Sequence, residues 1–387
     1  MDLDELKYEF RNSYGDGLCS VYFSPGRVNL IGEHTDYNGG FVFPCALSFG
    51  TYFLIRKTVE RFFRFRSLNQ VQEEKVDLNQ LIKPLAKGNW VNYPLGVIAQ
   101  FVKDGHHFET GADILIAGNV PNGAGLSSSA SLELATGVAI NDAYGFGKDK
   151  LTLVQYGQKS EHEFAGVLCG IMDQFASGMG KKDHAIYLNC DTLEYELVPV
   201  KLKGVKIVIG NTNSPHSLDS GKYNQRVAEC KAAVDAISPF KKITKLGDLS
   251  LDEFNSLSDK IKDVTVMRRA RHVISEIERT NQAVKALRDG DIMAFGLLMN
   301  ASHDSLRDDY KVTGFELDCM VDAARKIKGV IGSRMTGGGF GGSTVSLVRE
   351  ESVEEFIEKV GADYTKQTGL VGDFYLAEIG DGGKRIE

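Results

Sequence analysis

The chain has 387 residues, of which 42% are hydrophobic and 25% charged, a composition typical of a globular protein with a sizeable core and more than one domain. The formal net charge is −7 and basic residues form no run, which argues against a nucleic-acid-binding groove. No apolar stretch approaches the roughly 18 residues of a membrane-spanning helix, and the acidic start of the chain lacks the apolar segment of a secretory signal.

The first part of the chain favours strands and then helices. Apolar and aromatic runs separated by turns predict strands within 20–67, and another strand begins at Gly111. Apolar residues at helical spacing then predict helices over 129–143 and 149–165, and a third helix begins after Gly170.

The second part of the chain mixes the two kinds of element without strict alternation. Strands return at 184–190, 195–202 and from 205, residues beyond about 222 are mostly helical, and a last strand lies near 373–380. Such a mixture predicts an α+β fold in two lobes joined near residue 200. The N-terminal lobe would comprise residues 1–200, and the C-terminal lobe would comprise residues 201–387.

The stretch PNGAGLSSSASLELA combines two glycines, a run of serines and the start of a helix. Gly123 and Gly125 let the backbone approach an anion closely, and the amino end of the helix carries a partial positive charge. The stretch lacks the lysine of a GxxxxGK[ST] loop, so Mg²⁺ is the simplest source of further charge. A hydroxyl such as that of Ser129 and a carboxylate would hold it. A strand–loop–helix junction capped by serine is the alternative.

The stretch SPGRVNLIGEHTDYNGG begins at Ser24 and places Arg27 directly after a Pro-Gly break. Glu33, His34 and Asp36 then crowd a turn that ends in two glycines. Three hydrogen-bonding side chains so close together suit a ligand rich in hydroxyl groups, whereas transition-metal sites usually draw in more than one histidine. A polar hairpin whose side chains satisfy their own turn is the alternative.

Three further side chains stand out downstream. Glu161 is expected on the second helix and Asp173 in the first turn of the third, where solvated faces and caps explain most carboxylates. The apolar surroundings of Asp173 nevertheless indicate an acid that is paired or functional. Tyr223 shares a helical face with apolar residues, which is more typical of a core tyrosine than of a ligand. The glycine-rich stretch 335–342 is either a turn or a second backbone surface pressed against phosphates.

Together and in order, these stretches resemble the galactokinases, a family within the galactokinase, homoserine, mevalonate and phosphomevalonate kinase superfamily. PGRVNLIGEHTDYNGG is similar to the sugar-binding signature, PNGAGLSSSASLE to the phosphate loop and RMTGGGFGG to the third motif of the superfamily, while CGIMDQF and KYNQR complete the set. Ser343 stands where the family often has a cysteine. The resemblance implies the two-lobed α+β kinase fold, with the active site in the cleft between the lobes.

The resemblance also implies ATP-dependent phosphorylation of the anomeric hydroxyl of galactose, with ATP and Mg²⁺ as cofactors. The phosphates would lie against Gly123, Ala124, Gly125, Leu126, Ser127, Ser128 and Ser129. Ser67 would help to bind the nucleotide, and Ser129 and Glu161 would hold Mg²⁺. The sugar would contact Glu33, His34, Thr35, Asp36 and Tyr223, with Asp36 ionised. Asp173 would act as the base or orient the hydroxyl, and Arg27 would stabilise the transferring phosphoryl group.

Two other functions fit the same motifs. One is a kinase for a related sugar such as N-acetylgalactosamine, and the other is a galactose sensor that has lost the chemistry. The uninterrupted serine-rich loop, Arg27, Glu161 and Asp173 favour the kinase. The expected partners are small molecules, namely galactose and ATP, with no nucleic acid and no membrane. Six scattered cysteines without a CxxC pair indicate free thiols in a reducing cytoplasm. We expect the protein to be a monomer.

Overall fold

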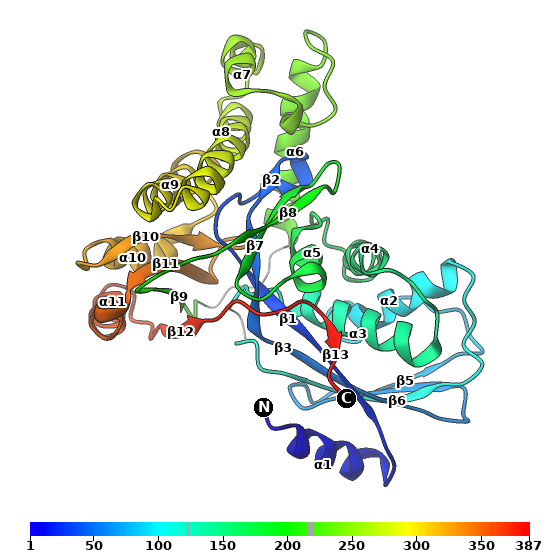
Figure 1. Ribbon diagram of the computed structural model, residues 1–387. Coiled ribbons are helices and arrows are strands. Elements are labelled where there is room, and N and C mark those ends of the chain that lie inside the picture. Colours follow the sequence, from blue (N-terminus) through cyan, green and yellow to red (C-terminus); the bar gives the residue numbers. More distant parts are fainter. Residues whose placement is uncertain (122–123, 215–219) are drawn as a thin grey trace.

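The computed structural model describes residues 1–121, 124–214 and 220–387. Figure 1 shows two main sheets with helices packed on them, which confirms the α+β prediction. Within the described residues the larger sheet has the strand order β13-β1-β3-β6-β4-β5. Its strands are β1 (Ser20–Asn29), β3 (Pro44–Lys57), β4 (Phe62–Ser67), β5 (Glu74–Asp77), β6 (Ala112–Gly118) and β13 (Lys384–Arg385).

Helices cover both faces of this larger sheet because successive side chains of its strands point to opposite sides. On one face Tyr22, Phe53 and Ile114 pack in a common core with the helices α2 to α5. On the other face Val21 and Leu54 pack against the first helix. The helices are α1 (Leu3–Tyr14), α2 (Asn92–Lys103), α3 (Ser128–Tyr144), α4 (Lys150–Ser160) and α5 (Met172–Met179).

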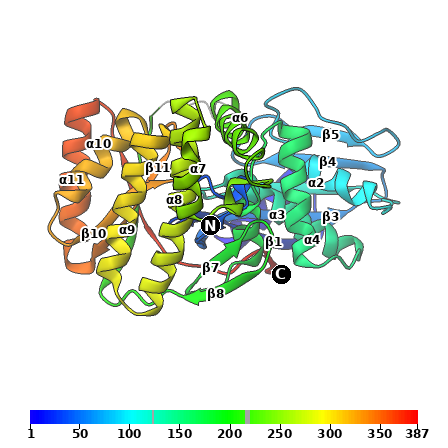
Figure 2. The ribbon, with the colours of Figure 1, turned by 90° about the horizontal axis from the view of Figure 1, so that it is seen from above.

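A four-stranded sheet, counted over the described residues, forms the core of the second half in the order β10-β11-β9-β12. Its strands are β9 (Val205–Asn211), β10 (Val330–Thr336), β11 (Ser343–Arg349) and β12 (Asp373–Ala377). The helices of this half are α6 (Ser220–Ile237), α7 (Leu251–Leu257), α8 (Val264–Arg288), α9 (Ile292–Ser305), α10 (Gly314–Arg325) and α11 (Val353–Thr368). Figure 2 shows α8 to α11 at one end of the molecule and α2 with β4 and β5 at the other.

One apolar cluster joins the two halves. Ile207 and Ile209 of β9 pack with Val28 and Phe43 from the first half. A small sheet of β2 (Phe41–Val42), β7 (His184–Asn189) and β8 (Tyr195–Pro199) lies beside this junction. We keep the division near residue 200 as a proposal, noting that β13 at the chain end pairs with β1 of the first half.

Most elements expected from the sequence are present, with several additions and one correction. The additions include α1, α2, β5 and β13, which occupy stretches to which the sequence pattern assigned no element. The helix expected over 149–165 ends at Ser160, and Glu161–Ala165 form a π-helical turn that Gly166 closes in the left-handed conformation. None of the described helices combines the length and the apolar character needed to cross a membrane.

Candidate active site

The loop between β6 and α3 is anchored by its apolar residues. Ala124 and Leu126 are buried in the cluster that joins the two halves. Gly125 and Ser127 adopt left-handed conformations, with φ of 63° and 59°. Gly123, which the sequence assigned to the same loop, lies outside the described residues. Gly125, between the two anchored residues, is exposed, so this part of the loop presents backbone rather than apolar side chains to a ligand.

The helix that follows this loop is left open at its amino end. Ser127 occupies the N-cap position of α3 but makes no side-chain capping hydrogen bond. The side chain of Ser128 is exposed and that of Ser129 is half-buried. The first amides of a helix lack partners within the helix and carry its positive dipole end. This end of α3 therefore offers donors and partial charge to an anion.

The glycine-rich stretch before β11 packs directly on the same loop. The Ser343 hydroxyl donates a hydrogen bond of 2.6 Å to the carbonyl oxygen of Ala124. A Cβ atom on Gly337, whose φ is 85°, would lie 3.1 Å from the Gly125 carbonyl oxygen. A Cβ atom on Gly125 would in turn lie 3.9 Å from the Cα atom of Gly342. The two glycine-containing segments thus form adjoining backbone surfaces, one from each half of the molecule.

Arg27 and Asp173 form a two-pronged ion pair next to the loop. The Arg27 Nε and Nη2 atoms each lie 2.7 Å from a carboxylate oxygen of Asp173, and Nη1 lies 2.8 Å from the carbonyl oxygen of Gly125. The Ser127 hydroxyl donates to the same carboxylate. The side chain of Arg27 is 4% exposed and that of Asp173 is 30% exposed. A buried guanidinium therefore fixes an accessible carboxylate against the loop.

Glu161 and Ser129 face each other across the amino end of α3. Burial raises the pKa of Glu161 to about 7, the hydrogen bond from Ser129 opposes this rise, and the charge of Asp173 adds to it. A divalent cation would replace the proton that this environment favours. Within the described residues no group of three or more histidine, cysteine or acidic side chains could hold a metal. The hydroxyl–carboxylate pair is therefore a partial site that suits Mg²⁺, which usually keeps waters and phosphate oxygens as ligands.

His34 lies in an aromatic cluster and is neutral. Its Nε2 atom lies 3.2 Å from the Gly338 carbonyl oxygen, and its Nδ1 atom lies 2.9 Å from the Tyr37 hydroxyl. Because a carbonyl only accepts, Nε2 carries the proton and Nδ1 accepts from Tyr37. Burial lowers the pKa of His34 to about 3. The ring of Tyr223, on α6, lies 5.7 Å from that of His34, centroid to centroid, and burial raises its pKa well above the usual value.

Glu33 and Thr35 hold the turn on which His34 lies. The Glu33 carboxylate is buried and accepts from the Gly337 amide at 2.8 Å and from Arg334 at 3.3 Å. The Thr35 hydroxyl donates to the carbonyl oxygens of Gly32 and Phe41, at 3.0 and 2.7 Å. The structure thus gives Thr35 a partner within its own turn and gives Glu33 partners from the second half of the molecule.

Asp36 departs from its expected ionisation state. Burial, followed by the negative charge of Asp173, raises the pKa of Asp36 to about 7. In the ligand-free protein Asp36 is therefore only partly ionised near neutral pH, and its ionisation beside a sugar stays a prediction. Asp36 lines a hollow of about 550 Å³ together with Cys169 and Gly170. A Cβ atom on Gly170 would lie 2.0 Å from an Asp36 carboxylate oxygen, so only glycine leaves room for this carboxyl.

Ser67 is the last residue of β4, and it lies at the end of the sheet where the loop between β6 and α3 begins. β4 runs parallel to β6, with Ser67 opposite Ile116, and the loop follows β6. Ser67 is buried and its hydroxyl oxygen accepts from the Asn69 amide at 3.1 Å. Within the described parts of the chain no hydrogen bond links Ser67 to the loop. Because β4 and β6 are parallel, Ser67 lies at the same end of the sheet as the loop that follows β6.

Three residues of this site were not predicted from the sequence: Tyr37, Gly170 and Arg334. The sequence pattern did not single out Tyr37 because it lies between polar turn residues. It did not single out Arg334 because an arginine in a strand usually faces solvent. Arg334 is instead fully buried against Glu33. An arginine directly before the glycine-rich stretch was the available signal for it.

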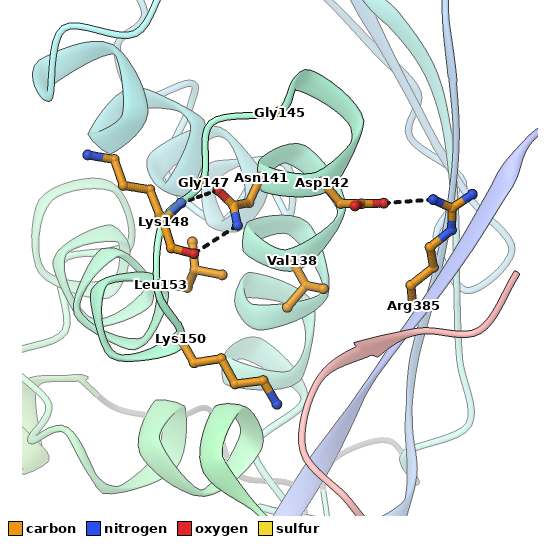
Figure 3. Close-up of a pocket in the computed structure, with 9 residues that line it drawn as sticks. All are labelled: Val138, Asn141, Asp142, Gly145, Gly147, Lys148, Lys150, Leu153 and Arg385. Atoms are coloured by element: carbon orange, nitrogen blue, oxygen red, sulfur yellow. Dashed lines mark hydrogen bonds and ion pairs between the residues drawn. The ribbon is translucent and has the colours of Figure 1, made fainter.

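A second hollow, of about 400 Å³, lies between α3, α4 and β13 (Figure 3). We call it the distal hollow, and its lining residues are Val138, Asn141, Asp142, Gly145, Gly147, Lys148, Lys150, Leu153 and Arg385. Asp142 pairs with Arg385 at 3.0 Å. None of the predicted site residues lines this hollow, so the acids described above belong to a different region.

Three family descriptions match the chain. "Galactokinase galactose-binding signature" matches residues 8–57, "GHMP kinases N terminal domain" matches residues 92–181, and "GHMP kinases C terminal" matches residues 283–366. A curated galactokinase of Clostridium acetobutylicum is 49% identical over 389 residues, covering 99% of both chains. The chain belongs to the galactokinase family. A galactokinase of Fusobacterium nucleatum is likewise 49% identical, over the full length of both chains.

Solved structures agree with this family assignment. The crystal structure of Lactococcus lactis galactokinase complexed with galactose has a TM-score of 0.97 and 44% identity, covering 99% of this chain and 100% of that one. The mevalonate kinase of Methanococcus jannaschii, at 19% identity and a TM-score of 0.67, shares the fold. As a member of the galactokinases, the chain is a kinase that uses ATP to phosphorylate a sugar.

Proposed function

We propose that the chain transfers the γ-phosphoryl group of ATP to the anomeric hydroxyl of D-galactose and forms α-D-galactose 1-phosphate. The observation that carries the proposal is the contact of Asp173 with both Arg27 and Ser127, because it links the sugar-binding signature to the phosphate loop. The relative from Lactococcus lactis, which covers almost the whole chain, was solved with galactose.

The phosphates of ATP would lie at the open amino end of α3. Backbone amides there and the hydroxyls of Ser128 and Ser129 would donate to them, and Ser67 would lie near the rest of the nucleotide. Ser129 and Glu161 would hold Mg²⁺, which the hydrogen bond between them supports. When bound, the metal supplies the positive charge that the loop lacks, because the loop contains no lysine.

Asp173 would receive the hydrogen bond of the anomeric hydroxyl. In the transfer the sugar oxygen forms a bond to the γ-phosphorus, the bond between this phosphorus and the bridging oxygen of ADP breaks, and the hydroxyl proton leaves late. Asp173 therefore orients the oxygen first and accepts its proton last. Arg27 would hold Asp173 and the Gly125 carbonyl in place while its charge stabilises the transferring group.

The sugar would lie against the turn of the binding signature. Asp36 and Tyr223 offer polar atoms that can bond to sugar hydroxyls, while Glu33 and His34 are held in fixed positions by Arg334 and Gly338. Thr35 would support the turn through its two carbonyl contacts. A site of this kind rejects an analogue that leaves a buried polar group unpaired.

A coupled assay of ADP release tests this function with galactose, glucose, 4-deoxygalactose and N-acetylgalactosamine. We expect galactose to be preferred over 4-deoxygalactose by about 10⁴-fold in kcat/KM, with the other two also far poorer. Asp36→Ala should raise the KM for galactose. Comparable rates on galactose and glucose would refute the assignment of the sugar site, a preference for N-acetylgalactosamine would change the substrate, and galactose binding without ADP release would indicate a sensor.

We further propose a monomer that works in the cytoplasm. Each of the six cysteines is a free thiol, and Cys45, Cys190, Cys230 and Cys319 are buried, which suits a reducing compartment. The net charge of −7 supports small-molecule partners rather than nucleic acid. Sedimentation of the purified protein tests the monomer.

A further inference from the structure

Glu133 is a buried acid to which the proposed mechanism gives no role. It lies on α3 one turn after Ser129 and has no exposed surface. Its negative neighbours are Glu161 and Asp173, which together with burial raise its pKa well above the usual value. In the described part of the chain no basic side chain pairs with it. A buried carboxyl without a cation is costly, and such groups are usually retained for a specific contact.

That contact is with the residue that follows Asp173. The side-chain amide of Gln174, which is 1% exposed, donates a hydrogen bond of 3.0 Å to Oε2 of Glu133. The Ser160 hydroxyl lies nearby, but it donates its proton to the Tyr93 carbonyl oxygen at 2.7 Å. The second carboxyl oxygen of Glu133, Oε1, and the amide oxygen of Gln174, Oε1, are both buried without a hydrogen bond. A carboxylic acid could donate to such an amide oxygen, whereas a carboxylate could not.

A glycine on a third helix makes room for this pair. A Cβ atom on Gly157 of α4 would lie 2.9 Å from the Gln174 Cγ atom and 3.3 Å from Glu133 Oε2. Helices α3, α4 and α5 therefore meet where these three residues touch. We call Glu133, Gly157 and Gln174 the helix junction.

The helix junction lies directly behind the candidate active site. Glu133 follows Ser129 by one turn of α3, Gly157 precedes Glu161 by one turn, and Gln174 is the neighbour of Asp173. Each of the three helices thus leads from the junction to one group of the site. A change in how the helices meet would shift the metal-binding pair relative to Asp173.

We propose that Glu133 is a positioning residue for phosphoryl transfer, which acts through Gln174 to set the spacing between Asp173 and the Ser129–Glu161 pair. The inference rests on the proposed function, because the three groups share a reaction only if the chain transfers phosphoryl groups. Glu133 itself touches neither substrate. Its loss should therefore lower the turnover number rather than the affinity for either substrate.

Kinetics of Glu133→Met and Glu133→Gln provide the test. Methionine fills a similar volume but cannot bond to Gln174, so kcat should fall by about 10- to 100-fold, as a small misplacement of reacting groups can cause. The KM values for galactose and ATP should stay within about threefold of the wild type. Glutamine can exchange hydrogen bonds with Gln174 in both directions, so Glu133→Gln should restore most of kcat.

A control variant and a double mutant separate positioning from general damage to the core. Thr136→Val removes another fully buried polar group of α3, whose hydroxyl donates only to the Leu132 carbonyl. It should lower the melting temperature without changing kcat of the folded enzyme. Gln174→Met should lower kcat as Glu133→Met does, and the double variant should lose little more than either single one.

Three outcomes would overturn the inference: an unchanged kcat in Glu133→Met, a loss in Glu133→Gln as large as in Glu133→Met, or additive losses in the double variant. All are read against an active wild type. If the wild type releases no ADP with galactose, the proposed function fails instead, so the two failures are distinguishable.

Discussion

The candidate active site and the distal hollow both contain acidic side chains, but these side chains differ in whether they have basic partners. In the distal hollow Asp142 pairs with Arg385 (Figure 3), and Lys148 beside it pairs with Asp104 at 2.9 Å. In the active site burial raises the pKa of Asp36 and of Glu161 to about 7, and neither has a basic partner among the described residues. Buried acids that have no basic side chain as a partner are candidates for binding a ligand.

Asp173 differs from Asp36 and Glu161 because it has a cation, Arg27, and it is the more accessible partner of that pair. Glu33 also has a cation, Arg334, but both partners of that pair are buried. Its fixed charge raises the pKa of both Asp36 and Glu161. The site therefore combines an accessible carboxylate that Arg27 holds in place with neighbours whose charge depends on what binds beside them.

The largest expected effect is that of Asp173→Asn. The amide keeps the shape but cannot accept the hydroxyl proton or pair with Arg27, so kcat should fall by about 10²- to 10⁴-fold. The affinity for ATP, measured by calorimetry, should change little. Asp142→Asn in the distal hollow is the matched control and should keep its kcat. A near-normal kcat in Asp173→Asn would remove this residue from the chemistry.

Glu161→Ala should act on the metal requirement. Since the loop has no lysine to replace the missing charge, the Mg²⁺ concentration for half-maximal activity at saturating ATP should rise by about 10-fold or more. Glu163, an exposed residue of the same π-helical turn, bonds to Lys103 and Gln100. Glu163→Ala should therefore leave the magnesium dependence as it is, and an equal shift in both variants would contradict the assignment.

Asp36→Asn should stabilise the ligand-free protein at alkaline pH. The folded-state pKa of about 7 lies above the usual 3.8, so the cost of ionising Asp36 is fully present above pH 7 and disappears as the pH falls toward 4. The variant should gain about 1 kcal/mol or more in the free energy of unfolding at pH 8, and less at pH 5.5. Urea unfolding without sugar measures the difference, and an equal gain at both pH values would contradict it.

The smallest effect is expected for Arg385→Ala. It removes the partly exposed partner of Asp142, which should cost at most about 1 kcal/mol of the free energy of unfolding. The kcat and the KM for galactose should equal those of the wild type. A loss of activity would show that the distal hollow communicates with the active site and would end the contrast between the two regions.

Local sequence patterns were sufficient for the outlines of the site. Glycines, serines and helical periodicity predicted the loop and the helix that follows it, because turns and helix ends depend on residues close in the chain. The same patterns predicted α5 with Asp173 in its first turn. They also predicted the α+β fold and β1, β3, β4 and β6, whose alternating residues fill both faces of the larger sheet.

The tertiary structure alone decided which partners these residues have. Glu33 meets Arg334, Ser343 meets Ala124, and Glu133 meets Gln174 across long stretches of chain. No local pattern encodes such contacts. The pKa of Asp36 in the ligand-free protein escapes sequence patterns for the same reason, since it depends on burial by distant segments and on the charge of Asp173. The sequence determined which groups are present and how each turn begins, and packing decided their charge and spacing.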